Sequence, residues 1–459
     1  MKKLLVLILT AALAFSLTAC GNDDSEEQGK VLNIRVWNDE FIGRFRDYYP
    51  GYVETNADGD DVLEDGTIVK WIQVANDNNG YQNALDTALL NQDDAAADDK
   101  LDMFLIEADY ALKYANDMYA LDVVEDLGLT TADLSEQYQY TKDIVTDADG
   151  VLRAVSWQAT PGLFAYRTDL ADEVLGTSDP VEVQALLNNW SKFDGVAEDM
   201  SDAGYAMISG YDDAYRTYSN NVSQPWVDED GKIIVDDEII NWIEQTKIYS
   251  DNGYNNGSGL WSGEWFTDMG PAGSAFGFFF STWGINFVLS GGSLEDAEAP
   301  AELGNGLFGQ WRVIEGPASF YWGGTWLVGA QGTDNEELVA DIMKAMTCNE
   351  EIMTQITLDT QDYTNNMAAM DSIASDSSYG SDFLGGQNHI ALFNENASVI
   401  DMSNISPYDQ GLNESIQNSF RDYFLGTITW DEAWASFEEQ VSTLYPELEL
   451  EEVPADPFQ

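Results

Sequence analysis

Aromatic residues stand beside acidic or amide residues at several points of this sequence, each where a predicted strand ends. Trp37 directly precedes Asn38 and Asp39, while Glu107 and Asp109 follow a short apolar run. In an open parallel sheet, ligands bind outside the carboxyl ends of the strands. There, an aromatic ring offers a flat face to a sugar, and carboxylate and amide groups take its hydroxyls. Core packing explains any single tryptophan equally well, but the recurrence favours a ligand site. Two further settings of this kind are Ser156-Trp157-Gln158 and Ser281-Thr282-Trp283-Gly284.

The stretch FYWGGTW, residues 320–326, holds four aromatic residues around a pair of glycines. Aromatic runs are typical of buried strands, and glycines inside them indicate a bend or a close approach to the backbone. We therefore expect the stretch to be divided between core and cleft. Phe320, Leu327 and Val328 are predicted in the core, Tyr321, Trp322 and Trp326 in the cleft, and Gly323 and Gly324 where a ligand or crossing strand approaches.

Catalytic motifs are weak in this sequence. The single histidine, His389, has no Gly-x-Ser-x-Gly or metal motif around it, so we expect a surface or loop residue. Residues 304–309, GNGLFG, match a dinucleotide fingerprint, but a strand-like segment follows where a phosphate-binding helix is required. With 82 acidic residues, any carboxylate spacing occurs by chance. We predict no catalytic residue, no metal and no cofactor.

The first twenty residues are predicted to be a lipoprotein signal peptide. Two lysines precede an apolar run that ends in Leu17-Thr18-Ala19-Cys20, and small residues before a cysteine indicate cleavage and lipidation at Cys20. Residues 21–30 form a polar tether of flexible composition. We therefore expect a lipid anchor on the extracellular side of the bacterial cell membrane. Cys348 remains alone, and its helical setting predicts a small buried or half-buried hydrophobic residue.

The formal net charge of −63 argues against binding to nucleic acid, anionic lipid surfaces or polyanions. It does not indicate disorder, because 44% of residues are hydrophobic and 12% aromatic. A chain of 459 residues exceeds one ordinary core, so two or three domains are expected.

Strand and helix patterns alternate along most of the chain. Residues 31–37 and 101–106 are predicted strands, and residues 81–90 and 110–119 predicted helices, which is the order of a parallel α/β sheet. A second α/β segment begins near residue 155. Thr429 and Glu432 have the spacing of a helix capping box, as do Asp334 and Glu337.

The chain resembles the carbohydrate-binding lipoproteins of bacterial ATP-driven (ABC) importers, which are similar in plan to maltose-binding protein. The resemblance rests on LTACG, VWND, DMFLIEADYALKYANDMYALDVVEDL, PGLFAYRTDLADEV, STWGINF and FYWGGTWLVGA. It implies a type II periplasmic-binding-protein-like fold of two α/β lobes that close on a sugar. It also implies a monomer that delivers an oligosaccharide to the permease subunits of an ABC transporter. We expect the first lobe to comprise 31–154 plus 275–325, and the second 155–274 plus 326–459.

Site residues follow from the same resemblance. It implies first-lobe hydrogen bonds from Asn38, Asp39, Glu107 and Asp109, and it places Trp157 and Gln158 beside the hinge. Trp37 is a further candidate because it lies at the end of the first predicted strand. It implies that Trp283 stacks on a sugar, that Tyr321, Trp322 and Gly323 line the cleft near a second crossing, and that Asp409 contributes from the second lobe.

Two other functions remain open at this point. One is a tethered glycan-active enzyme, and the other is a binding protein for peptides or another polar solute. Arg153 and Arg167 are candidates to grip a carboxylate, although structural roles are expected for both.

Overall fold

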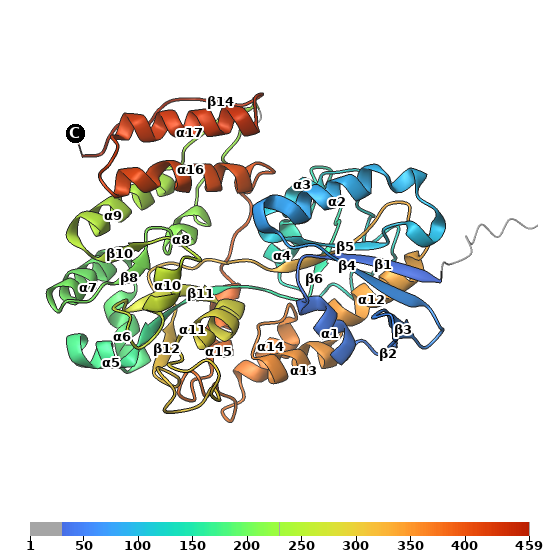
Figure 1. Ribbon diagram of the computed structural model, residues 1–459, viewed down its shortest axis with the longest axis horizontal. Coiled ribbons are helices and arrows are strands. Elements are labelled where there is room, and N and C mark those ends of the chain that lie inside the picture. Colours follow the sequence, from blue (N-terminus) through green and yellow to red (C-terminus); the bar gives the residue numbers. More distant parts are fainter. Residues whose placement is uncertain (1–29, 229, 459) are drawn as a thin grey trace, which may run out of the picture.

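The computed structural model describes residues 30–228 and 230–458, and it has two lobes, each built around a β-sheet (Figure 1). The predicted signal peptide, Cys20 and nearly all of the tether lie outside the described residues. Within the described part of the chain, no helix has the length and hydrophobicity needed to cross a membrane.

The first lobe contains a seven-stranded sheet of order β2-β3-β4-β1-β5-β13-β6. Strand β1 runs parallel to β4 and β5, while β13 runs antiparallel to β5, with Thr325 opposite Glu107. Four of the five residues of β5, MFLIE, are buried, because helices cover both faces of the parallel strands. The strands are β1 (Val31–Val36), β2 (Tyr52–Thr55), β3 (Asp61–Leu63), β4 (Ile68–Gln73), β5 (Met103–Glu107), β6 (Val155–Ser156) and β13 (Thr325–Gly329).

The helices of this lobe come from two distant parts of the chain (Figure 1, blue and orange). They are α1 (Glu40–Tyr48), α2 (Gly80–Leu90), α3 (Ala111–Ala115), α4 (Gln139–Asp143), α12 (Glu336–Cys348), α13 (Glu350–Thr360) and α14 (Met367–Ala374). A short 3-10 turn, η4 (Ala108–Tyr110), joins β5 to α3.

The second lobe has the antiparallel sheet β11-β7-β12 and a parallel pair, β10-β8. All six residues of β7, GLFAYR, are buried between the neighbouring helices. Its strands are β7 (Gly162–Arg167), β8 (Ile208–Gly210), β10 (Asn255–Ser258), β11 (Gly277–Ser281) and β12 (Trp311–Ile314), with β9 (Lys232–Ile233) paired to β14 (Glu449–Leu450). Its helices are α5 (Thr168–Leu170), α6 (Pro180–Leu187), α7 (Trp190–Asp202), α8 (Tyr215–Ser219), α9 (Asp237–Asn252), α10 (Gly263–Asp268), α11 (Ser290–Gly292), α16 (Asp409–Phe424) and α17 (Trp430–Leu444). Helix α15 (His389–Ala397) contacts both α14 and β7.

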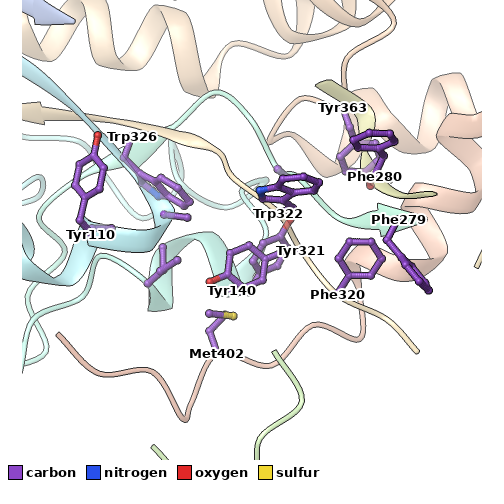
Figure 2. Close-up of a cluster of buried hydrophobic side chains, with 14 of the residues drawn as sticks. Tyr110, Tyr140, Phe279, Phe280, Phe320, Tyr321, Trp322, Trp326, Tyr363 and Met402 are labelled. Carbon is purple, nitrogen blue, oxygen red and sulfur yellow. The ribbon is translucent and has the colours of Figure 1, made fainter. Parts of the chain in front are cut away.

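Two crossings between the lobes lie against each other. One joins β6 to β7 and the other joins β12 to β13. Backbone hydrogen bonds link them: Gly162 donates to Phe320 at 2.7 Å, and Trp322 donates to Thr160 at 3.0 Å. Figure 2 shows Tyr321 and Trp322 on the second crossing, between Trp326 on one side and Phe279, Phe280 and Phe320 on the other. The aromatic stretch is thus the segment that passes from lobe to lobe.

The predicted division of the chain between the lobes does not match these sheets. Residues 275–325 were expected in the first lobe, but β11 and β12 within them pair with β7 of the second. Strand β13, expected in the second lobe, pairs with β5 of the first, and α12 packs against it. A fully buried strand such as GFFFS fits the centre of either sheet, so its sequence does not identify its partner.

Candidate functional site

A cavity of about 400 Å³ lies between the lobes, within the size range of small-molecule sites. The first lobe contributes η4 and the start of α3, directly after the carboxyl end of β5. The second lobe contributes α8, the loop before α10, the segment 401–407 and the first half of α16. The crossing residues Phe320, Tyr321 and Trp322 also line it.

The exposed aromatic surface of the cavity belongs to Trp261. This residue is 52% exposed, and its backbone has a φ of 66°, in the left-handed region that non-glycine residues rarely occupy. Its ring stacks against Trp283 with centroids 6.3 Å apart. Backbone strain of this kind concentrates at functional sites, where it aims a side chain. Trp261 is therefore the ring best placed to receive a flat ligand.

Trp322, by contrast, is buried and its ring already contacts other side chains. It stacks on Phe280 at 5.8 Å, nearly parallel at 6°, and the guanidinium of Arg216 lies 5.4 Å from its ring centroid. The indole nitrogen of Trp283 donates to the Trp322 carbonyl at 2.8 Å. Gly323 lets Trp283 come this close, because a Cβ there would lie 2.9 Å from that nitrogen. Trp283 and Gly323 thus support the cavity wall from behind.

An ion pair joins the two lobes inside the cavity. Arg216 on α8 donates to both carboxylate oxygens of Asp109 on η4, at 2.8 and 2.7 Å. Burial favours the neutral acid, but the guanidinium outweighs it and lowers the pKa of Asp109. Burial and the Asp109 charge raise the pKa of Glu107 to about 8. Glu107 accepts the Asp109 backbone N–H at 2.8 Å and so positions η4.

Half-buried carboxyl groups face the cavity from the second lobe. Burial and the neighbouring Asp213 raise the pKa of Asp212 to about 8. One oxygen of Asp212 is buried without a hydrogen-bond partner, and the other accepts the Leu260 N–H at 3.3 Å. Burial also raises the pKa of Asp409 to about 7, although its carboxylate accepts the hydroxyl and N–H of Ser406. Asp212 and Asp409 therefore have acceptor capacity for ligand hydroxyls.

Four of the residues predicted from the sequence line the cavity. They are Asp109, Tyr321, Trp322 and Asp409.

The remaining predicted residues lie elsewhere. Trp37 packs edge-on against Tyr81 at 5.4 Å, and neither it nor Asn38, Asp39 or Glu107 is part of the lining. The cavity opens over the end of β5, whereas the end of β1 leads into α1.

Trp157 and Gln158 are structural. Trp157 is 1% exposed and stacks on Phe41 at 5.0 Å. The side-chain amide of Gln158 donates to Glu40 at 2.8 Å and Asp362 at 2.9 Å, so both of its N–H groups are used at the first crossing. Trp326, also predicted for the cleft, is 1% exposed and donates to the Thr141 carbonyl at 2.8 Å.

His389 is buried, not on the surface as expected. Its Nε2 lies 3.0 Å from the Gln361 carbonyl, and burial lowers its pKa to about 4. The glycines of residues 304–309 lie in turns that lead into strand β12, as the strand-like segment after them predicted. Among the described residues, no group of histidine, cysteine and acidic side chains has a metal-binding arrangement.

The two arginines considered for carboxylate binding lie outside the cavity. Arg153 pairs with Asp147, and Arg167 pairs with Asp169.

Six residues that line the cavity were not predicted from the sequence: Arg216, Trp261, Asp212, Tyr215, Asn220 and Asn413. A signal for Trp261 is its place in the small-residue loop GSGLWSGEW. Arg216 is one of only 19 basic residues. A rare cation in a helix between aromatic residues is a signal for a functional position.

Known structures share the fold of this chain at low sequence identity. An extracellular solute-binding protein of family 1 aligns with a TM-score of 0.68 and 15% identity, over 90% of this chain and 99% of its own. The ABC transporter-associated binding protein of B. animalis subsp. lactis Bl-04, in complex with β-1,6-galactobiose, aligns with a TM-score of 0.65 and 17% identity. The alignment covers 92% of this chain and 100% of that protein. The galacto-N-biose-/lacto-N-biose I-binding protein of Bifidobacterium longum, in complex with lacto-N-biose, aligns with a TM-score of 0.64 and 12% identity. The alignment covers 92% of this chain and 100% of that protein.

Sequence comparison gives the family directly. A search of curated proteins found no significant match. The sequence profile described as bacterial extracellular solute-binding protein, however, matches residues 44–382, which is well over half of the chain. The fold agrees with that match, and the chain belongs to the bacterial extracellular solute-binding proteins.

Proposed function

We propose that this protein captures a neutral oligosaccharide in the cavity between its lobes and delivers it to the permease of an ABC importer. The observation that carries the proposal is the cavity itself, in which exposed Trp261 lies among hydroxyl-binding groups from both lobes. A ligand that contacts both lobes stabilises the closed form, and the paired crossings provide the hinge.

Within this proposal, Trp261 stacks on a sugar ring, while Asp212, Asp409 and Asn413 bind its hydroxyls. Tyr321 and Trp322 form the floor, and Asp109 acts at the first-lobe edge. Sugars bound in structures of the same fold support this ligand class. The protein performs no chemistry on the sugar, which agrees with its membership of a family of binding proteins.

We further propose a division of the chain that follows the sheets, with 31–156 and 325–374 in the first lobe and 162–314 and 399–458 in the second. The family is extracellular, and the LTAC motif supports a lipid anchor at Cys20 that holds the monomer near its permease.

The test is calorimetry and tryptophan fluorescence on a soluble form, residues 30–459. The panel contains β-1,6-galactobiose, lacto-N-biose, maltotriose, digalacturonate and short peptides. Micromolar or tighter binding of one neutral glycan, with no new reducing ends after long incubation, is the expected result. Release of reducing ends would support a glycan-active enzyme instead, and a response to peptides alone would overturn the sugar assignment.

A further inference from the structure

Arg216 is the cation that dominates the cavity. Among the described residues that line the cavity, two are basic, Lys113 and Arg216. Lys113 is 41% exposed at its side chain and pairs with Asp86 of its own lobe. Arg216 instead reaches from the second lobe to the first, and its pair with Asp109 buries part of both side chains.

The geometry of this pair is that of a strong ionic contact. Two parallel N–H···O bonds give a fork-to-fork arrangement, which is stronger and more directional than a single contact. Trp322 lies under the guanidinium, so the arginine is held in place on one face. The neighbouring Gln82 on α2 and Gln410 on α16 add a weaker contact between the lobes at 3.3 Å.

Charge is balanced within the pair. Asp109 is ionised beside Arg216, and the half-buried Glu107 behind it favours its neutral form. A neutral ligand can enter the cavity without changing this balance. An anionic ligand that approaches Arg216 must displace Asp109, and it also meets Asp409 and Glu414 nearby.

We propose that Asp109 and Arg216 form an interlobe clasp that holds the lobes together without ligand and makes the cleft selective for uncharged sugars. The selectivity for uncharged sugars rests on the proposed function. The effect of the clasp on lobe closure does not depend on that function. Because the clasp is partly solvated, its effect on the open-to-closed ratio is modest, at roughly fivefold. The clasp also raises the binding-competent fraction, and apparent affinity for a neutral ligand scales with that fraction.

The first test uses no ligand. Small-angle scattering of the soluble form compares the wild type with Asp109→Asn, Arg216→Gln and the double variant. We expect a larger radius of gyration for each single variant, and no further increase in the double variant because both changes break one pair. Asp169→Asn is the matched control, since it removes a bidentate arginine partner within the second lobe.

Circular dichroism and thermal unfolding of each variant separate opening of the lobes from loss of the fold. Should one variant fail to fold, the other removes the same pair. Wild-type scattering from both folded single variants would overturn the clasp, whatever the ligand panel shows.

The second test measures charge selectivity with digalacturonate as the anionic probe. We expect Asp109→Asn combined with Glu107→Gln to bind it at least tenfold more tightly than the wild type, because Arg216 is then free. No gain over wild type would overturn the selectivity. Failure of the proposed function is recognised separately, since it is the absence of sugar binding by the wild type.

Discussion

Replacement of Trp261 by alanine tests the cavity most directly. Trp261 is 52% exposed, and aromatic side chains bury about 150–250 Å² in full contact. A sugar covering most of the exposed part removes roughly 80 Å² from water, worth about 2 kcal/mol at ~25 cal/mol per Å². We therefore expect Trp261→Ala to weaken binding by roughly 30-fold.

Calorimetry with the tightest glycan of the panel measures this loss. The fold is expected to stay intact, because Trp261 is half exposed and lies at the cavity surface. Phe287→Ala is the matched control, since that ring is 57% exposed and does not line the cavity. If Trp261→Ala changes the affinity by less than twofold, the stacking role of Trp261 is refuted.

Three further predictions concern stability. Asp61→Ala should destabilise the protein by about 2–3 kcal/mol in urea unfolding, because the fully buried carboxylate accepts bonds from three side chains. Gly323→Ala should cost about 2 kcal/mol and perturb tryptophan fluorescence, since φ is 78° and the new Cβ would press on an indole nitrogen. Stability should fall as the pH rises from about 6.5 to 8, above the range in which His389 titrates, because Asp212 and Asp409 have pKa values of about 8 and about 7 when folded. Both groups bind their protons more tightly in the folded state, so their stabilisation is present at low pH and is lost as they ionise.

Each of these has a control. Glu449→Ala removes a carboxylate from an exposed pair with Lys232 and should cost little. Gly128→Ala also has a positive φ but open space around the new Cβ, so it isolates the backbone cost from the clash. For the pH series, Asp212→Asn should flatten the decline, and an unchanged profile would contradict the assignment.

The sequence by itself determined the local elements. The alternation of apolar runs and helical stripes marked β1, β5 and α17, because periodicity records which face of an element is buried. The capping box of Thr429 and Glu432 is present at the start of α17, since all its atoms lie within four residues. The Asp334–Glu337 box is wrong: α12 begins after Asn335, whose side chain instead bonds Val31 and Asp102 of the sheet.

Only the tertiary structure decided which elements meet. Asp109 and Arg216 are 107 positions apart, and no local pattern links them. Trp157 and Trp261 both stand beside small or polar residues, yet one is in the core and the other at the cavity. The physical reason is that the local sequence shows how hydrophobic a side chain is. Which neighbours cover that side chain is determined by long-range strand pairing and by the packing of the lobes.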